Sequence, residues 1–140
     1  VRGEKFELGV TITTTDESLA CKLEPRAPPP DAREAVLEEF SACGVETWLF
    51  LGPIIPSIND SRDQLKRVLR IAKKCNSYVI YDKLSLKPGV LERLGCIIDD
   101  EELKKIATLA RADSEWWKRV KSEIERICRG LGVKHEPAFP

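Results

Sequence analysis

The first eighty residues alternate between short strand-like apolar runs and stretches with helical spacing. Segment 6–14 (FELGVTITT) is β-branched and alternates between apolar and polar positions, which predicts a strand. Segment 47–51 (TWLFL) is continuously apolar, as expected for a strand covered on both faces, and 77–81 (SYVIY) is a third strand. The order strand, helix, strand, helix, strand predicts parallel pairing through crossover helices.

Helical stripes follow each of the first two strands. After three prolines, Asp31 begins a helix as its cap or first-turn residue, and Gly44 ends it. Asp60 or Ser61 caps the next helix, whose core positions are Leu65, Val68, Leu69, Ala72 and Cys75. The rest of the chain has helical patterns only, at 90–94, 101–112 and 114–131. A further helical turn is expected at 17–23.

The expected fold class is therefore α/β, with parallel βα repeats, about three strands and C-terminal helices. Gly130 and Gly132 should end the last helix, and the tail can add a short extended segment. We expect 1–95 to form part of a barrel and 96–140 a helical extension packed on it. Three strands are few for a sheet, which typically has about four to six, so further strands should come from an N-terminal half or from a partner chain. The absence of methionine also favours a fragment.

Composition and charge narrow the class of protein. Charged residues make up 33% of the chain, the formal net charge is +0, and no apolar run reaches the roughly 18 residues of a membrane span. A soluble protein without a membrane partner is expected, and zero net charge weighs against strong steering onto nucleic acid. The basic residues of the last two helices are interpreted as solvated faces.

The five cysteines are far apart and form no CxxC or CxxxCxxC, so their spacing signals neither a zinc nor an iron–sulfur site. Cys43, Cys75 and Cys128 fall in register with apolar helical positions. They are expected to be small buried hydrophobic residues in a reducing, cytoplasmic compartment.

Ligands of parallel βα folds bind at the carboxyl ends of the strands. Here that edge comprises 13–16, 52–55 and 81–83. Thr11 and Thr13 lie on the strand face opposite Val10 and Ile12, so their hydroxyls can bind a ribose or a carboxylate. Threonine also simply favours strands, and the two interpretations carry equal weight.

The other polar residues at this edge have structural interpretations. Gly52 lets a flat ring approach the backbone, although an ordinary turn explains it as well. Asn59 and Asp60 are expected in turns and caps. Asp82 and Lys83 are expected to form a structural ion pair, with contact of one of them to a substrate as the alternative. The single histidine, in the tail, suggests neither catalysis nor metal binding.

Four segments together resemble a known family: GVTITTTDESLACKLEPRAPPPDAR, WLFLGPIIPSIND, YVIYDKLSLKPGV and RICRGLGVKHEPAF. The chain is similar to the C-terminal half of radical S-adenosylmethionine proteins related to spore photoproduct lyase, described as DNA repair photolyase-like. The resemblance covers nearly the whole chain. It implies a partial (β/α)6 barrel and a parent lyase in which a [4Fe–4S] cluster on CxxxCxxC reductively cleaves S-adenosylmethionine.

The resemblance also implies positions for the cofactor. Hydroxyls of the first strand would contact the ribose or amino-acid part, the loop after the second strand would hold the adenine, and the end of the third strand would lie near the same ring. These cofactor-binding residues are Thr11, Thr13, Gly52, Pro53, Ile54, Ile55 and Tyr81. Glu24 and Arg26 match the family's EPR segment, with no role beyond a loop-anchoring ion pair.

CxxxCxxC is absent, so the chain alone should hold no cluster and carry no catalytic or metal-binding residues. The first hypothesis is the C-terminal part of a radical enzyme that acts on a substrate such as a nucleic-acid lesion. The alternative is a non-enzymatic half-barrel that self-associates as a homodimer through its open strand edges and binds a nucleotide-like ligand or a protein. A partner-binding module of the last helices, built on Trp116 and neighbouring lysines, is the third.

Overall fold

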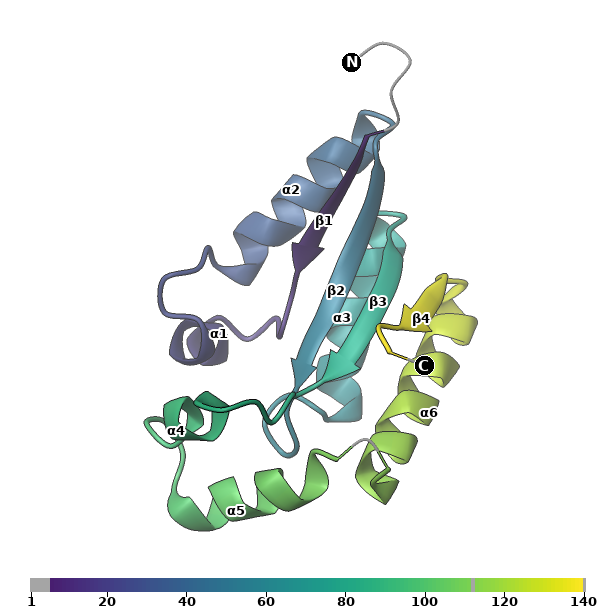
Figure 1. Ribbon diagram of the computed structural model, residues 1–140. Coiled ribbons are helices and arrows are strands. Elements are labelled where there is room, and N and C mark those ends of the chain that lie inside the picture. Colours follow the sequence, from purple (N-terminus) through teal and green to yellow (C-terminus); the bar gives the residue numbers. More distant parts are fainter. Residues whose placement is uncertain (1–5, 112, 140) are drawn as a thin grey trace.

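A computed structural model describes residues 6–111 and 113–139. Its centre is a four-stranded sheet in the order β1-β2-β3-β4, with every neighbouring pair parallel (Figure 1). The strands are β1 (Glu7–Thr11), β2 (Glu46–Ile54), β3 (Tyr78–Lys83) and β4 (His135–Pro137). The sheet therefore has one strand more than the three that were expected, because the tail forms β4 and pairs with β3.

Three helices cover one face of the sheet, and three gather near the carboxyl ends of its strands (Figure 1). The covering helices are α2 (Pro30–Ala42), α3 (Arg62–Lys74) and α6 (Glu115–Leu131). The others are α1 (Glu17–Leu23), α4 (Val90–Leu94) and α5 (Asp100–Leu109). The helix expected at 101–112 thus ends at Leu109, and Ala112 lies outside the described residues.

Side-chain alternation along the strands divides the sheet into two faces. Leu49, Leu51 and Val79 turn toward the helices and are at most 1% exposed. They form one core with residues of α2, α3 and α6. The expected apolar stripe of α3 is buried there throughout. Because α6 belongs to this core, residues from 1–95 and 96–140 are packed together.

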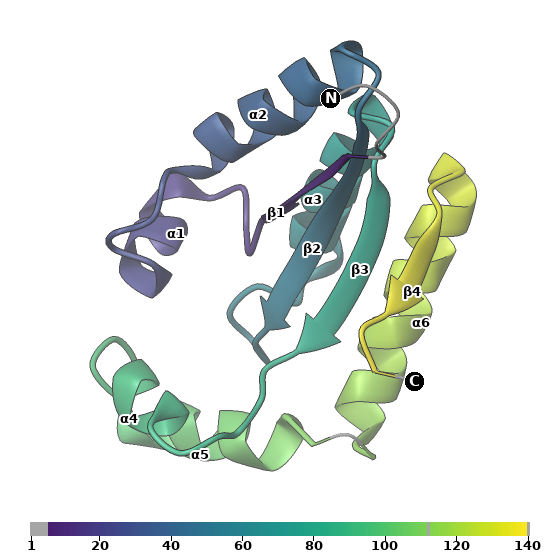
Figure 2. The same cartoon turned by 45° about the horizontal axis from the view of Figure 1, so that its top comes forward.

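The opposite face, called the open face below, is not covered by these helices (Figure 2). The strand registers place the same parity of residues on it: Gly9 lies beside Trp48, Thr11 beside Phe50, and Trp48 beside Tyr78. The open face consists of Glu7, Gly9, Thr11, Glu46, Trp48, Phe50, Tyr78, Ile80 and Glu136.

The helix ends follow local rules with one correction. Of the two residues expected to cap α3, Ser61 does so by accepting from Gln64 N–H at 3.2 Å. Asp60 instead accepts a hydrogen bond from the indole nitrogen of Trp116 at 2.8 Å. Gly130 lies inside α6, and Gly132 alone ends that helix, at a φ of 72° that a side chain rarely adopts.

A second, smaller core lies beyond the carboxyl ends of the strands. It joins Ile55 and Leu84, which follow β2 and β3, to Leu94, Ile106 and Ala110 of the α4–α5 region. Leu23 of α1 packs against it. The chain itself therefore covers part of the edge at which a ligand was expected.

The cysteines divide differently from the expectation. Cys75 and Cys128 are buried, whereas Cys43, the C-cap residue of α2, is exposed. None of the described helices combines the length and apolarity needed to cross a bilayer.

Candidate functional site on the open face of the sheet

Asn59 holds the carboxyl ends of the first two strands together. The residue is 1% exposed. Its amide nitrogen donates to Thr13 O and to Pro53 O, each at 3.0 Å, and its amide oxygen accepts from Ile55 N–H at 2.6 Å. A buried amide that uses two donors and one acceptor fixes the relative position of both loops. Asn59 was expected only to stabilise a turn, whereas it joins the ends of two strands.

The two threonines expected to contact a cofactor lie in different environments. Thr11 is half-buried on the open face, beside Phe50. Thr13 follows β1, is 5% exposed, and donates its hydroxyl to Gly52 O at 3.2 Å. The Thr13 hydroxyl, which was expected to contact a ribose or a carboxylate, therefore ties the first strand to the second.

The predicted adenine loop is partly strand. Residues 52–54 are the last of β2, whose register with β3 shifts between Leu51 and Ile54. Ile54 is 0% exposed in the main core, and Ile55 is 2% exposed in the second core. Gly52 lies against the Phe50 ring, where a Cβ would approach Phe50 Cε1 to 2.7 Å, and Pro53 is exposed. Of the four residues predicted to contact the adenine, Pro53 is exposed, whereas Gly52, Ile54 and Ile55 are buried.

Tyr81 lies on the helix side of the sheet. Its side chain is 0% exposed, and its ring packs edge-on against Trp117 with centroids 6.2 Å apart. Burial, followed by the nearby Glu125 carboxylate, raises the Tyr81 pKa to about 12. The ring is thus separated by the sheet from any ligand on the open face.

Two expected ion pairs are replaced by other contacts. Asp82 accepts from Lys83 N–H at 2.8 Å, and within residues 6–111 and 113–139 no ion pair joins their side chains. Glu24 forms an ion pair at 3.3 Å with Arg33 of α2 and not with Arg26, which is exposed. Arg33 also donates to Thr11 O, so this pair anchors the loop to the end of β1.

Sequence reasoning missed the aromatic residues of the open face. Trp48, Phe50 and Tyr78 are half-buried there. The continuous apolarity of TWLFL predicted that this strand would be covered on both faces. Gly9 and Thr11, on the same face of the neighbouring strand, were a signal that this face is less covered.

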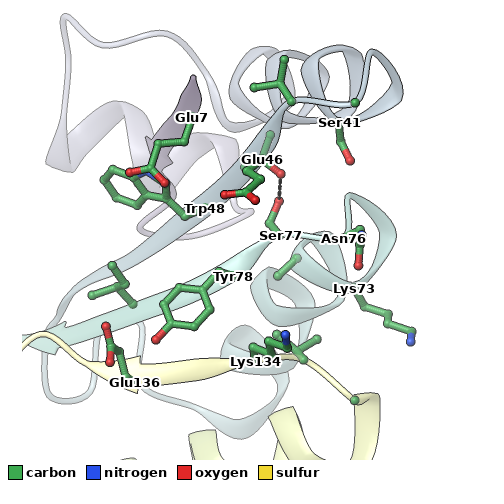
Figure 3. A pocket seen from close by; sticks show the side chains of 17 residues that line it. Glu7, Ser41, Glu46, Trp48, Lys73, Asn76, Ser77, Tyr78, Lys134 and Glu136 are labelled. Atoms are coloured by element: carbon green, nitrogen blue, oxygen red, sulfur yellow. Dashed lines mark hydrogen bonds between the residues drawn. The ribbon is translucent and has the colours of Figure 1, made fainter. Parts of the chain in front are cut away.

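A cavity of about 820 Å³ begins at the amino-terminal ends of the strands and extends onto the open face (Figure 3). Trp48 and Tyr78 line it together with three glutamates, Glu7, Glu46 and Glu136. Lys73 and Lys134 also line it, and in Figure 3 Lys73 lies at the end remote from Glu7 and Trp48.

The described residues do not fit an iron–sulfur cluster. They contain no group of three or more histidine, cysteine or acidic side chains placed to hold a metal. Burial raises the pKa of Cys75, and burial together with Glu125 raises the pKa of Cys128 to about 12. Both thiols therefore stay protonated at neutral pH, which disfavours metal ligation.

Comparisons with known proteins show which structures and sequences this chain resembles. No protein-family model matches the chain. A stretch of 67 residues is 39% identical to the uncharacterised protein ORF301 of Acidianus two-tailed virus, covering 48% of this chain and 22% of that protein. Thus the chain spans under a quarter of this relative.

A solved domain of pyruvate-formate lyase-activating enzyme from Bacteroides vulgatus ATCC 8482 has a similar structure. The TM-score is 0.62 at 12% sequence identity, and the match covers 94% of this chain and 66% of that one. At this identity the likeness shows the fold alone. The expected fold, parallel βα repeats of a partial barrel, is confirmed.

Proposed function

We propose that this chain forms the C-terminal wall of a radical S-adenosylmethionine barrel, with the adenosine part of the cofactor bound at the carboxyl end of the open face. The observation that supports this proposal best is the similarity of 94% of the chain to a domain of pyruvate-formate lyase-activating enzyme, which is a radical S-adenosylmethionine enzyme. The family resemblance of the four sequence segments, including its photolyase-like character, is a separate support.

The residues at this end of the open face suit an adenosine group. Thr11 presents a hydroxyl that makes no side-chain hydrogen bond within the described residues. Half-buried Phe50 and exposed Pro53 offer apolar surfaces, and the missing side chain at Gly52 lets the Phe50 ring lie against the strand. When bound to a reduced cluster, S-adenosylmethionine supplies the adenosyl radical. This chain contributes a wall that orients the adenosine and excludes water.

The described residues lack a site for the cluster, so we propose that the chain is inactive by itself. A segment bearing CxxxCxxC, the other half of the barrel, would supply the cluster and complete the wall. The parent's substrate, a nucleic-acid lesion in the photolyase-like version of the proposal, would be bound in the completed barrel.

Calorimetry tests the proposed adenosine contact. Thr11→Val removes the hydroxyl and keeps the shape of the side chain. We expect it to weaken binding of S-adenosylmethionine by about 2- to 10-fold, corresponding to one hydrogen bond of roughly 0.5–1.5 kcal/mol. Thr108→Val is the matched control, since the Thr108 hydroxyl donates within α5 to Lys104 O at 3.0 Å. Equal affinities for the wild type and Thr11→Val would refute the assignment.

One observation favours a second function, self-association as a non-enzymatic half-barrel. β1 pairs with β2 on one side, and no strand among the described residues pairs with its other side. Such an edge is a template for another chain. Sedimentation of the purified chain discriminates: a monomer over the micromolar range excludes this alternative, and a dimer supports it.

A further inference from the structure

The cavity of the open face combines carboxylates and aromatic rings in a way that the proposed adenosine site does not use. Glu7 of β1 and Glu46 of β2 are direct partners in the register of the sheet. Two like charges directly opposite one another destabilise a strand pair. Within the described part of the chain, neither glutamate forms an ion pair.

Two aromatic rings lie next to these carboxylates. Trp48 follows Glu46 on the same face, and Tyr78 is its neighbour in the register of β3. The Trp48 ring lies over Gly9, where a Cβ would be 1.9 Å from Trp48 Cε2, and the same ring lines the cavity. The absence of a side chain at Gly9 thus lets the indole lie flat on the sheet.

Rings and carboxylates together form a recognisable binding chemistry. The face of an indole or phenol ring attracts a cation within about 6 Å of its centroid, and quaternary ammonium groups are bound in this way. The cavity volume of about 820 Å³ falls within the roughly 300–1,000 Å³ typical of small-molecule sites. Carboxylates around such a cleft raise the local concentration of cations.

We propose that this cavity binds a small organic cation with a substituted ammonium group, held between the Trp48 and Tyr78 rings and the carboxylates of Glu7 and Glu46. Glu136 adds a third carboxylate at the Tyr78 side (Figure 3). Burial and the Glu136 carboxylate raise the pKa of Tyr78, so its ring stays neutral and remains a cation acceptor.

The lysines of the cavity do not replace this ligand. Lys73 ends α3 and lies at the far side of the cavity, away from Glu7 and Trp48 (Figure 3). Lys134 also lines the cavity, but neither lysine forms an ion pair with the three glutamates among the described residues. The carboxylates therefore outnumber the ammonium groups on the open face.

This site is independent of the proposed adenosine contact. It lies toward the amino-terminal ends of the strands, whereas Thr11 and Gly52 lie at the carboxyl ends. Loss of one function therefore leaves the other intact, and the two proposals can fail separately.

Nuclear magnetic resonance provides the test. The chain is titrated with tetramethylammonium chloride, and the indole N–H signal of Trp48, assigned with Trp48→Phe, is followed at constant ionic strength kept with NaCl. Tert-butanol, a neutral molecule of similar shape, is the matched probe. We expect a saturable shift with tetramethylammonium and none with tert-butanol.

Variants connect the shift to the carboxylates. Glu46→Gln changes an exposed residue and should weaken tetramethylammonium binding by about threefold, because the cation loses one of the carboxylates that face it. Glu39→Gln on the exposed side of α2 should leave it unchanged. A shift that does not saturate, that tert-butanol reproduces, or that Glu46→Gln does not weaken overturns the proposal.

Discussion

Replacing Asn59 by aspartate removes two buried donors with almost no change of shape. In the wild type the amide nitrogen lies 3.0 Å from both Thr13 O and Pro53 O. A carboxylate oxygen at the same place would face two carbonyl oxygens and repel both. The contact to Ile55 N–H, at 2.6 Å, would persist. The variant thus isolates the donors that hold the two loops together.

The magnitude follows from the number of groups left unpaired. Each buried carbonyl that loses its partner costs about 1–3 kcal/mol, and the new buried charge adds to this cost. We expect Asn59→Asp to lower the free energy of unfolding by at least about 3 kcal/mol, a large part of the 5–15 kcal/mol typical of a domain. The loss should be smaller at pH 5 than at pH 8, because a protonated carboxyl regains one donor.

Urea unfolding followed by circular dichroism measures this difference. Asn76→Asp is the matched control, because the same atoms change at an exposed residue with a φ of 51° that aspartate also tolerates. It should alter stability by at most about 0.5 kcal/mol. If Asn59→Asp falls within 1 kcal/mol of the control, roughly a fivefold change in the unfolding equilibrium, then Asn59 does not hold the strand ends together.

Other substitutions test the remaining contacts. Gly9→Ala places a Cβ 1.9 Å from the Trp48 ring, so it should cost about 1–3 kcal/mol in urea unfolding and shift the tryptophan fluorescence to longer wavelength. Tyr81 has a folded-state pKa of about 12 against 10.0; its stabilising contribution is full below pH 10 and lost as pH rises toward 12. Tyr81→Phe should flatten that alkaline loss in unfolding measured between pH 9 and 11.5. Arg33→Met should lower stability by about 1–3 kcal/mol by thermal unfolding, because the partly buried Thr11 carbonyl loses its charged donor, whereas Arg26→Met should not.

For each of these three substitutions, a specific result would contradict the prediction. Gly130→Ala, in open space within α6, should stabilise by about 0.5–1 kcal/mol; an equal effect at Gly9 would mean that the Trp48 ring is not in contact. For Tyr81, a slope unchanged in the phenylalanine variant would assign the alkaline loss to other groups. Arg33→Met and Arg26→Met with the same melting temperature would remove the anchoring role of the Glu24–Arg33 pair.

The periodicity of the sequence determined the elements and their order. The helices at 17–23, 62–74 and 90–94 lie where the pattern predicted them, because each depends on local spacing, capping and turn residues. The strands predicted at 6–14 and 77–81 exist with shifted ends, at 7–11 and 78–83. Parallel pairing followed from strand and helix alternation, and the resemblance of the segments anticipated the partial barrel.

Tertiary structure alone decided which side chains reach the site. The sequence could not show that the tail pairs with β3, since three residues carry little periodicity. Nor could it show that Tyr81 faces Trp117, because a continuously apolar strand does not reveal which parity meets the helices. Asn59 lies 46 residues from Thr13; its hydrogen bonds exist only once both strands are side by side, and so does the cavity between Glu7, Glu46 and Trp48.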